Sequence, residues 1–432
     1  MKQKTIIGLI FMLLACLPLR AQTAAVTAEN PKIDETELRR QSFEKVWTTI
    51  NEKHFDPAFG GVDWQKMREI YQPKAMSAKT REEFHGILRQ MLGELKLSHF
   101  SVYSNETAVQ TGEFKDGTIG IDLKIIDKEA VISRVEKDSN AEKAGLKTGF
   151  IIKKIDGKTT TELLEKLESY LAARETNEKM KQIYRERTLV NFIAGKSKSV
   201  AKLEVSNARN QAQIFNVERY VAKNEMSEAL GNFPPQEIVF ESKRLENGIG
   251  YIRFNIWVVP QMPKIRAAIR EFADAKGIIF DLRGNPGGIG GMAPGVAGFL
   301  SNERISLGSM TGRESELKFI AYPQSNAFLG KIMILSDYGT GSTSEIFAAG
   351  MQEAGRAKVI GETSAGAVLP SVFEKLPTNA TFQYAVSDYK SPKNVLIEGR
   401  GVIPDTEVRQ TRKALLAGQD LLLEESIRQI LN

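Results

Sequence analysis

The spacing of apolar residues changes character along the chain. Over residues 36–97, apolar side chains recur at helical spacing, which indicates amphipathic helices. From about residue 113, apolar and polar positions alternate, as they do in half-buried strands. Beyond residue 237, short apolar runs alternate with helical patterns. This succession predicts an α/β multidomain protein with a helical part, a β-rich part and an α/β part in that order.

The N-terminal helical subdomain is predicted to span residues 35–107. A glycine-containing loop at 56–63 separates its helical segments, and each segment carries an apolar stripe that predicts a buried face. The stripes comprise Phe43, Val46, Trp47 and Ile50 in the first segment and Phe84, Ile87, Leu88, Met91 and Leu92 in the second.

The β-rich domain is predicted to span residues 113–219. A short helix should end at Gly145, and Asp156-Gly157 predicts a turn between strands. A charged helical stretch at about 161–189 is predicted to be an insertion. The predicted strands lie at 118–125, at 129–135 and near 199–219.

The α/β domain is predicted to span residues 237–432 and to end in a helix at about 413–430. Its strands are near-continuous apolar runs, which are typical of parallel sheets covered on both faces. The predicted strands lie at 249–257, 277–282, 331–336 and 358–361, and helices are predicted at about 262–275, from about 288 and from Ser342.

Composition and charge narrow the class of protein. The 432 residues are 42% hydrophobic and 26% charged, as in globular proteins of two or three domains. The net charge of +6 comes without a basic stripe of interleaved aromatic residues, which argues against a nucleic-acid partner. Because Cys16 is the only cysteine and His54, His85 and His99 lie far apart in the sequence, we expect no metal site and no cofactor.

Residues 1–21 are predicted to be a targeting segment. A basic start precedes an apolar stretch at 5–15 that is too short to span a membrane. Two processing routes are open: cleavage after Ala21, which we favour, or lipidation of Cys16, since the preceding residues resemble a bacterial lipobox. Both routes predict an exported protein, periplasmic or extracellular, and the second would make it an outer-membrane lipoprotein.

Ser342 is the first candidate for chemistry. A predicted strand at 331–336 runs into a glycine-containing turn, and a helix opens at Ser342. The hydroxyl would then lie near unpaired N–H groups and the positive end of the helix dipole, which favour a developing negative charge. A serine nucleophile in acyl transfer benefits from this environment. The alternative is that Ser342 is only an N-cap, for which serine is a preferred residue.

Three further polar features lie at strand ends or turns: Asp-Leu-Arg-Gly-Asn-Pro-Gly-Gly at 281–288, Ser98-His99, and Glu-Gly-Arg-Gly-Val-Ile-Pro-Asp at 398–405. The paired glycines of the first allow close approach of the backbone and can direct N–H groups at an anion. A phosphate-binding loop is the competing interpretation, but neither a following Gly-Lys-Ser/Thr nor GxGxxG spacing is present. A lone histidine such as His99 is, by itself, more often structural.

Together these features resemble the C-terminal processing (tail-specific) serine peptidases and their tricorn-core relatives. The 281–288 segment resembles the family's DLRxNxGG, and 341–352 resembles its SxSEIxAxAxQ nucleophile helix, with Gly350 in place of the last alanine. Segments 361–366 and 398–405 match two later motifs. The resemblance covers nearly the whole mature chain and implies a ClpP/crotonase-like catalytic domain with Ser342 as nucleophile, Ser344 being the rival.

One departure from the family bears on the mechanism. In the processing peptidases a lysine follows the glycine of the second motif and deprotonates the serine, but here Gly366 is followed by Ala367. The tricorn-like branch implies a histidine base oriented by a glutamate, and His99 and Glu398 stand at the matching places. The resemblance therefore implies a triad in which Ser342 is the nucleophile, His99 is the general base and Glu398 orients His99.

An oxyanion hole is implied beside this triad. It would combine the backbone N–H of Thr343 with that of Gly287 or Gly288, which would stabilise the negative charge of a tetrahedral intermediate.

The β-rich domain resembles a PDZ domain. Residues 143–157 resemble the PDZ signature, with Phe150 where aspartate is usual. In PDZ domains, backbone N–H groups of a glycine-containing loop bind the C-terminal carboxylate of a peptide. Ile119, Gly120 and Ile121 stand in the matching loop and are the predicted peptide-binding residues.

These resemblances predict an exported serine endopeptidase that cleaves peptides or unfolded and C-terminal protein segments. Its predicted partner is a peptide or unfolded protein, with membrane contact only through a lipid anchor at Cys16, and the sequence predicts no oligomeric state. A catalytically silent homologue that binds peptides is the alternative. A crotonase-like acyl-CoA enzyme is a second one, against which the PDZ resemblance and export argue.

Overall fold

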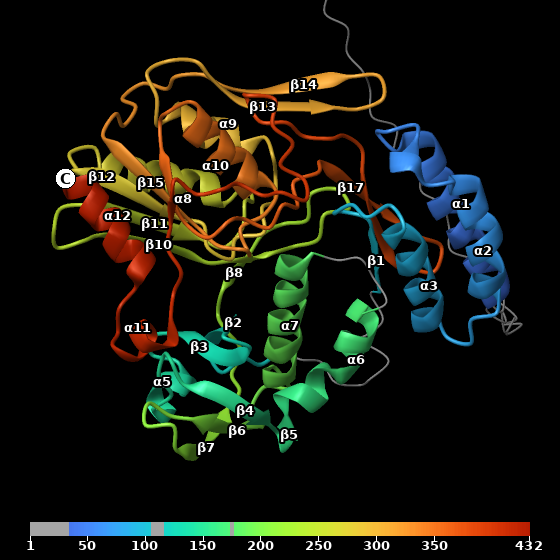
Figure 1. The fold of residues 1–432 in the computed structure, drawn as a ribbon, viewed down its shortest axis with the longest axis horizontal. Coiled ribbons are helices and arrows are strands. Elements are labelled where there is room, and N and C mark those ends of the chain that lie inside the picture. The colour runs from blue at the N-terminus through green and yellow to red at the C-terminus, as the bar shows by residue number, and fades with distance from the viewer. Residues whose placement is uncertain (1–33, 105–115, 173–176) are drawn as a thin grey trace, which may run out of the picture.

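The computed structural model describes residues 34–104, 116–172 and 177–432. The predicted targeting segment at 1–21, including Cys16, lies outside these residues. Figure 1 shows a helical unit at the N-terminus, a β-rich unit and a larger α/β unit. The fold is therefore a mixed α/β multidomain fold, as the sequence predicted.

A six-stranded sheet forms the centre of the α/β unit. Its strand order is β10-β11-β12-β15-β16-β19, and all neighbours from β11 onward are parallel. The central strand β12 is buried along its whole length, as expected of a parallel strand covered on both faces. The strands are β10 (Phe240–Arg244), β11 (Gly250–Phe254), β12 (Gly277–Asp281), β15 (Lys331–Ser336), β16 (Lys358–Gly361) and β19 (Thr406–Glu407).

Helices cover both faces of this sheet. The largest apolar core lies between one face and three helices, α8 (Gln261–Glu271), α9 (Met292–Gly298) and α10 (Thr343–Glu353). On the other face, α12 (Leu421–Leu431) buries Leu422 and Ile430 against the strands. The single C-terminal helix expected at about 413–430 is divided into α11 (Arg412–Leu416) and α12, because the chain turns at Gly418 with a φ of 72°.

The β-rich unit contains a second, antiparallel sheet with the order β2-β3-β4-β6-β7, to which β5 is added beside β4. The predicted short helix is confirmed as α5 (Asn140–Ala144), and Gly145 ends it with a φ of 89°. The charged insertion forms α6 (Thr160–Ala172) and α7 (Glu178–Ile193). The strands are β2 (Ile121–Ile126), β3 (Glu129–Val135), β4 (Ile151–Ile155), β5 (Lys158–Thr159), β6 (Val200–Ser206) and β7 (Ala212–Glu218).

The N-terminal unit contains α1 (Glu35–Lys53), η1 (Phe59–Gly61), α2 (Trp64–Met76) and α3 (Arg81–Gly93). Its apolar core is completed from far along the chain, by Phe382 and Tyr384 of strand β18. That strand lies in a three-stranded sheet with the order β1-β18-β17. The strands are β1 (Ser101–Tyr103), β17 (Ser371–Lys375) and β18 (Thr381–Ala385), and their pairing was not predicted from the sequence.

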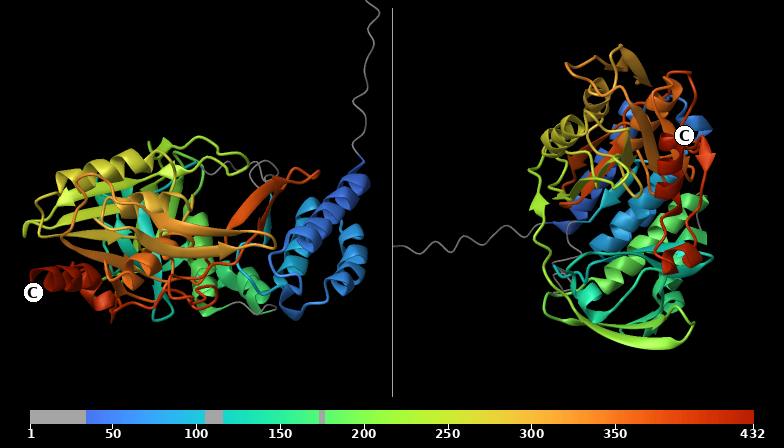
Figure 2. Two further views of the ribbon diagram at one scale, coloured as in Figure 1. Left: turned by 90° about the horizontal axis from the view of Figure 1, so that it is seen from above. Right: turned by 90° about the vertical axis from the view of Figure 1, so that its left-hand side faces the viewer.

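A hairpin of β13 (Ile305–Thr311) and β14 (Glu316–Ala321) extends from the α/β unit toward the N-terminal helices (Figure 2). At its tip, Arg313 donates to the carbonyl oxygens of His54 at 2.5 Å and Asn51 at 2.8 Å. A short ladder of β8 (Glu225–Met226) and β9 (Glu237–Ile238) lies in the connection between the β-rich and α/β units. Within the described ranges, no helix is both long and apolar enough to cross a membrane.

Candidate active site

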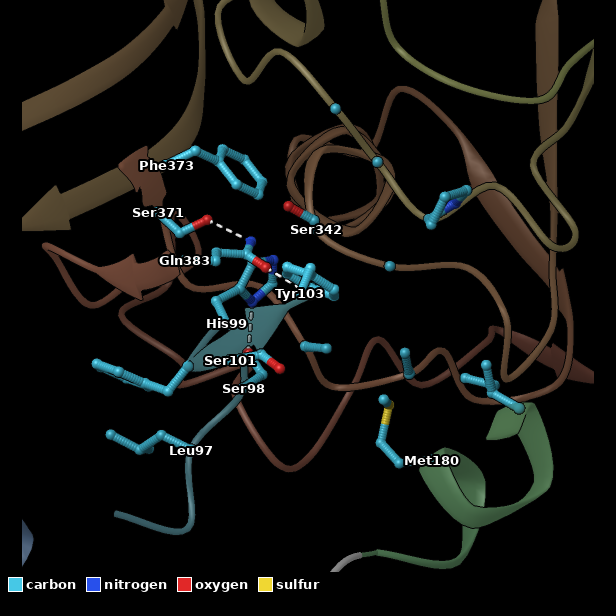
Figure 3. Close-up of a pocket in the computed structure, with 18 of the residues that line it drawn as sticks. Leu97, Ser98, His99, Ser101, Tyr103, Met180, Ser342, Ser371, Phe373 and Gln383 are labelled. Atoms are coloured by element: carbon cyan, nitrogen blue, oxygen red, sulfur yellow. Dashed lines mark hydrogen bonds between the residues drawn. The ribbon is translucent and has the colours of Figure 1, made fainter. Parts of the chain in front are cut away.

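One large cavity, of about 1150 Å³, is lined by residues from all three units. Ser342, His99 and Glu398, the three residues of the predicted triad, all lie in its wall. Figure 3 shows Ser342 and His99 in this cavity, with Met180 of α7 entering from another side. The wall is built from residues 96–104, helices α6 and α7, residues 286–290, the start of α10, and strands β17 and β18.

Ser342 follows a tight turn between β15 and α10. The carboxylate of Asp337 holds this turn by accepting the N–H of Gly339 at 2.9 Å. Ser342 itself has φ 51° and ψ −119°, whereas the ordinary N-cap Ser139 has φ −69° and ψ 164°. A positive φ is costly for a residue with a side chain, and such strain is typical of functional turns. The backbone of Ser342 thus differs from that of an ordinary helix cap.

The rival hydroxyl, that of Ser344, lies in the core. Ser344 is fully buried and accepts a hydrogen bond from the indole N–H of Trp257 at 2.8 Å. Two residues along a helix correspond to about 200° of rotation, so the two hydroxyls lie on nearly opposite sides of α10. Only Ser342 is positioned to meet a ligand in the cavity.

The paired glycines after β12 pack directly against the Ser342 turn. A Cβ on Gly287 would lie 2.5 Å from the Cβ of Ser342, and Gly287 has a φ of 99°. Its N–H donates to Oδ1 of Asn285 at 3.0 Å, while the N–H groups of Gly288 and Thr343 donate to no residue that the structure describes. Of the two predicted glycines, Gly288 is therefore the one whose N–H is available to a ligand.

Charged side chains of the same motif support this loop. Asp281 is fully buried and accepts bonds from the hydroxyl of Tyr251 at 2.7 Å and from Nη2 of Arg283 at 2.6 Å. Arg283 also reaches Asp420, which caps α12. Although burial opposes its ionisation, the Arg283 guanidinium holds the pKa of Asp281 well below the usual range. The DLR part of the motif thus fixes the loop rather than facing the cavity.

A chain of hydrogen bonds connects His99 to Glu398 through a third residue. The Oγ of Ser98 lies 2.6 Å from Nδ1 of His99 and donates to Oε2 of Glu398 at 3.0 Å. Glu398 also accepts the N–H groups of Ser98 at 2.7 Å and Val368 at 2.9 Å. The sequence resemblance predicts that Glu398 orients His99 directly, whereas in the structure Ser98 bridges the two, a role that was not predicted from the sequence.

The protonation of this chain follows from simple counting. When Glu398 is ionised it can only accept, so the single hydroxyl proton of Ser98 points toward it. Nδ1 of His99 must then carry its proton toward Ser98, which leaves the lone pair on Nε2. Among the described residues no hydrogen bond joins His99 to Ser342, although both residues line the same cavity.

Burial shifts the ionisation of both groups toward their neutral forms. It lowers the pKa of His99 to about 4, so the imidazole is neutral at physiological pH. Burial also raises the pKa of Glu398 above its usual value, against the hydrogen bonds from Val368 and Ser98. A neutral imidazole is the form that accepts a proton from a hydroxyl.

A second buried carboxylate, Glu345, lies beneath the Ser342 turn. Its Oε2 accepts hydrogen bonds from the backbone N–H groups of Ser342 and Ala367, both at 3.0 Å. Its Oε1 accepts hydrogen bonds from the Ser364 hydroxyl at 2.5 Å and from the Gly366 N–H at 2.7 Å. Burial raises the pKa of Glu345 to about 7. Glu345 was not among the residues predicted from the sequence, although serine followed three residues later by glutamate is a recognised helix-start pattern.

Helix α7 of the β-rich unit packs against Ala367, the position at which the sequence resemblance predicts a lysine. Ala367 packs in an apolar cluster with Met180 and Ile183 of α7. Its carbonyl oxygen accepts the N–H of Ser342 at 2.9 Å, so this contact lies next to the candidate nucleophile. Helix α7 of the predicted insertion is therefore part of the active-site wall.

The predicted peptide-binding loop lies apart from this cavity. Ile119 and Ile121 are buried in the apolar core of the β-rich unit, and Gly120 has a φ of 84°. None of the three lines the cavity that contains Ser342. In the part of the chain that the structure describes, no three His, Cys, Asp or Glu residues are arranged to hold a metal ion.

Comparison with known families agrees with this site. The sequence profile of peptidase family S41 matches residues 248–408, which include the glycine loop, Ser342 and Glu398. The profile of the tricorn protease C1 domain matches residues 36–93.

Full-length relatives extend the similarity. The carboxyl-terminal-processing protease of Synechocystis sp. is 25% identical over 386 residues, which cover 87% of this chain and 82% of that protein. The carboxy-terminal processing protease CtpB of Bacillus subtilis is 23% identical over 403 residues, covering 90% and 72%. The structure of a photosystem II D1 C-terminal processing protease is similar in fold, with a TM-score of 0.56 at 20% identity, covering 87% and 93% of the two chains. Residues 248–408 therefore form a peptidase family S41 domain, and the protein is a serine peptidase related to the carboxyl-terminal processing and tricorn proteases.

Proposed function

We propose that the protein is an endopeptidase in which Ser342 is the nucleophile and His99 the general base, with Glu398 acting on His99 through Ser98. The hydrogen-bonded chain from His99 Nδ1 through Ser98 to Glu398 is the observation that carries this proposal. It supplies what the absent lysine at position 367 would otherwise have to supply, a group able to accept the serine proton.

The reaction begins with proton transfer from Ser342 Oγ to Nε2 of His99 as Oγ attacks the substrate carbonyl carbon. The imidazolium then donates this proton to the leaving amine, whose bond to the carbonyl carbon breaks to give an acyl-enzyme. Water hydrolyses the ester in a second round with the same base. Glu398 and Ser98 hold the tautomer and stabilise the imidazolium during both rounds.

The oxyanion of each tetrahedral intermediate binds to the N–H groups of Gly288 and Thr343. This choice rests on their N–H groups having no other acceptor among the described residues, whereas that of Gly287 donates to Asn285. Losing one such donor typically raises the barrier by about 3 kcal/mol.

The proposed domains, peptide-binding residues and substrates rest on the sequence resemblances. We propose a PDZ-like domain at 113–219 that docks substrate C-termini at Ile119, Gly120 and Ile121, between a helical subdomain at 35–107 and a ClpP/crotonase-like catalytic domain at 237–432. Substrates are peptides or unfolded and C-terminal protein segments, and export through the segment at 1–21 gives access to them outside the cytoplasm.

The test is cleavage of a quenched fluorescent peptide library by the wild-type protein and by Ser342→Ala and Ser344→Ala. Ser342→Ala should lose all cleavage, whereas Ser344→Ala, if folded, should keep a serine that is phosphonylated by a serine-directed phosphonate. Cleavage by Ser342→Ala at the wild-type rate would refute the assignment. A folded wild-type protein that binds peptides but neither cleaves them nor reacts with the phosphonate would favour the silent homologue.

A further inference from the structure

Helix α7 presents one face to the active-site cavity. Met180, Ile183, Tyr184 and Arg187 all line it, at the spacing of residues that share a helix face. Met180 and Ile183 make the contact near Ala367 described above. Arg187 lies seven residues beyond Met180, which is about 10 Å along the helix axis.

Arg187 is an unpaired cation within the part of the chain that the structure describes. It is exposed and has no ion pair or hydrogen bond there. Arg185, two residues earlier on a different face, contrasts with it, because Nε and Nη2 of Arg185 lie 2.6 Å and 2.8 Å from the carboxylate of Glu168.

The acidic side chains in the cavity wall already have hydrogen-bond partners. Glu82 accepts from Nη2 of Arg89 at 2.5 Å, and Glu398 is held by Ser98 and Val368. Arg187 therefore adds a positive charge to the wall that no described carboxylate neutralises.

Tyr103 lies near this charge on the wall formed by strands β1, β18 and β17. Its hydroxyl donates to Oε1 of Gln383 at 2.8 Å, and Nε2 of Gln383 donates to Ser371 Oγ at 2.8 Å, which forms a polar row on the cavity side of the sheet (Figure 3). Tyr103 is 49% exposed, and it lines the cavity together with Arg187. Although about half of its surface is exposed, partial loss of water within the cavity raises the pKa of Tyr103, and the positive charge of Arg187 opposes that rise.

We propose that Arg187, with Tyr103 beside it, forms a subsite for a carboxylate of the peptide substrate. A guanidinium binds a carboxylate through two parallel hydrogen bonds, an arrangement that a partly enclosed cavity strengthens. The subsite rests on the peptidase function and specifies its substrates. The rise of about 10 Å from Met180 to Arg187 along α7 corresponds to about three residues of extended chain, so the carboxylate lies several residues from the scissile bond. It comes either from the C-terminus of the substrate or from an Asp or Glu side chain.

Binding of fluorescent peptides to the Ser342→Ala protein separates this subsite from catalysis. The peptides form matched sets: a free C-terminal acid against its amide, and an internal Glu against Gln, each placed two to six residues from the cleaved bond. The carboxylate member of one set should bind about tenfold more tightly, and adding Arg187→Gln should abolish that difference while leaving the neutral member unchanged. The set that responds identifies the source of the carboxylate.

Arg185→Gln in the same background is the matched control and should leave the difference intact. Equal binding of acidic and neutral peptides would overturn the subsite, and so would a preference that persists in Arg187→Gln, because the carboxylate would then bind elsewhere, for instance at the 119–121 loop. Neither result depends on Ser342 or His99, so the proposed mechanism would stand or fall separately, by the cleavage test above.

Discussion

The ammonium group of Lys124 lies 2.8 Å from Oδ2 of Asp337, and this ion pair joins the β-rich unit to the turn that carries Ser342. Lys124 belongs to β2, and its ammonium also lies 4.3 Å from the ring centroid of Tyr338. The other carboxylate oxygen of Asp337 accepts the N–H groups of Gly284 at 2.8 Å and Gly339 at 2.9 Å. One buried carboxylate thus holds both the glycine loop and the Ser342 turn, and its counter-ion comes from another unit.

Replacing Lys124 with Met should therefore lower activity from a distance. Although burial disfavours its charge, Asp337 and Glu186 raise the pKa of Lys124, and its removal leaves their carboxylates without this cation. We expect a loss of about 2 kcal/mol in unfolding free energy, since Lys124 is partly exposed, and a kcat at least tenfold lower. Urea unfolding and steady-state kinetics measure the two effects.

Lys154→Met is the control for that variant. Lys154 lies in the same sheet and pairs with Glu204 at 3.0 Å, but both side chains are more than a third exposed and distant from Asp337. It should change neither stability nor kcat by a measurable amount. A Lys124→Met protein with wild-type kcat would show that the ion pair does not support the catalytic turn.

The pH dependence of cleavage should reflect the ionisation of His99. The imidazole must be neutral to accept a proton, and its pKa of about 4 keeps it neutral well below pH 7. Activity is therefore present above the folded-state pKa and lost as the pH falls through it. We expect kcat/KM to stay level from pH 7 to about 5 and to fall toward pH 4, with circular dichroism verifying that the protein remains folded. An acidic limb centred near the ordinary histidine pKa of about 6.5 would contradict this environment.

Ser98 can be tested by removing and restoring one hydroxyl. Ser98→Ala breaks the chain between His99 and Glu398, which should lower kcat about 100-fold with little effect on KM. Ser98→Thr keeps a hydroxyl on the same carbon and should recover most of that loss. If the alanine variant is as active as the wild type, Glu398 does not act on His99 through Ser98.

The elements that could be predicted are those whose structure depends on residues close together in the sequence. The strand, turn and helix around Ser342 follow from an apolar run, a glycine-containing turn and a helical pattern within about twenty residues. The bridge from Ser98 to Glu398 joins positions 300 apart, and strand β1 pairs with a strand near the opposite end of the chain. No local pattern encodes such contacts. The role of α7 was hidden for the same reason, because its charged sequence does not reveal which unit its Met180–Ile183 face covers.

Glu345 should prove essential to the turn. Glu345→Gln replaces one acceptor oxygen with an amide nitrogen, which cannot accept the N–H groups that the carboxylate now holds. We expect a cost of about 2 kcal/mol and a large loss of kcat. Glu353→Gln, at the other end of α10, is the control: Glu353 accepts Ser391 Oγ and the Lys393 N–H far from the cavity.

The pH dependence of the free energy of unfolding tests the raised pKa of Glu345. Because its folded-state pKa is raised from 4.5 to about 7, the folded protein holds this proton more tightly than the unfolded chain. Its contribution to stability is therefore full below about pH 4.5 and declines as the pH rises to 7. Subtracting the Glu345→Gln curve from the wild-type curve should isolate this decline, and a flat difference would mean that the carboxyl ionises normally.

Gly287 offers a test of the close approach between the glycine loop and Ser342. In Gly287→Ala the new Cβ would lie 2.5 Å from the Cβ of Ser342 and 2.8 Å from the N atom of Thr343, so the loop must move away. Displacing the N–H of Gly288 should lower kcat about 100-fold or more. Gly284→Ala is a matched control, since Gly284 also has a positive φ of 71° but nothing within 4 Å of its Cβ position. It should cost about 1 kcal/mol of stability and leave kcat near the wild-type value, and an equal loss in both variants would assign the effect to backbone strain alone.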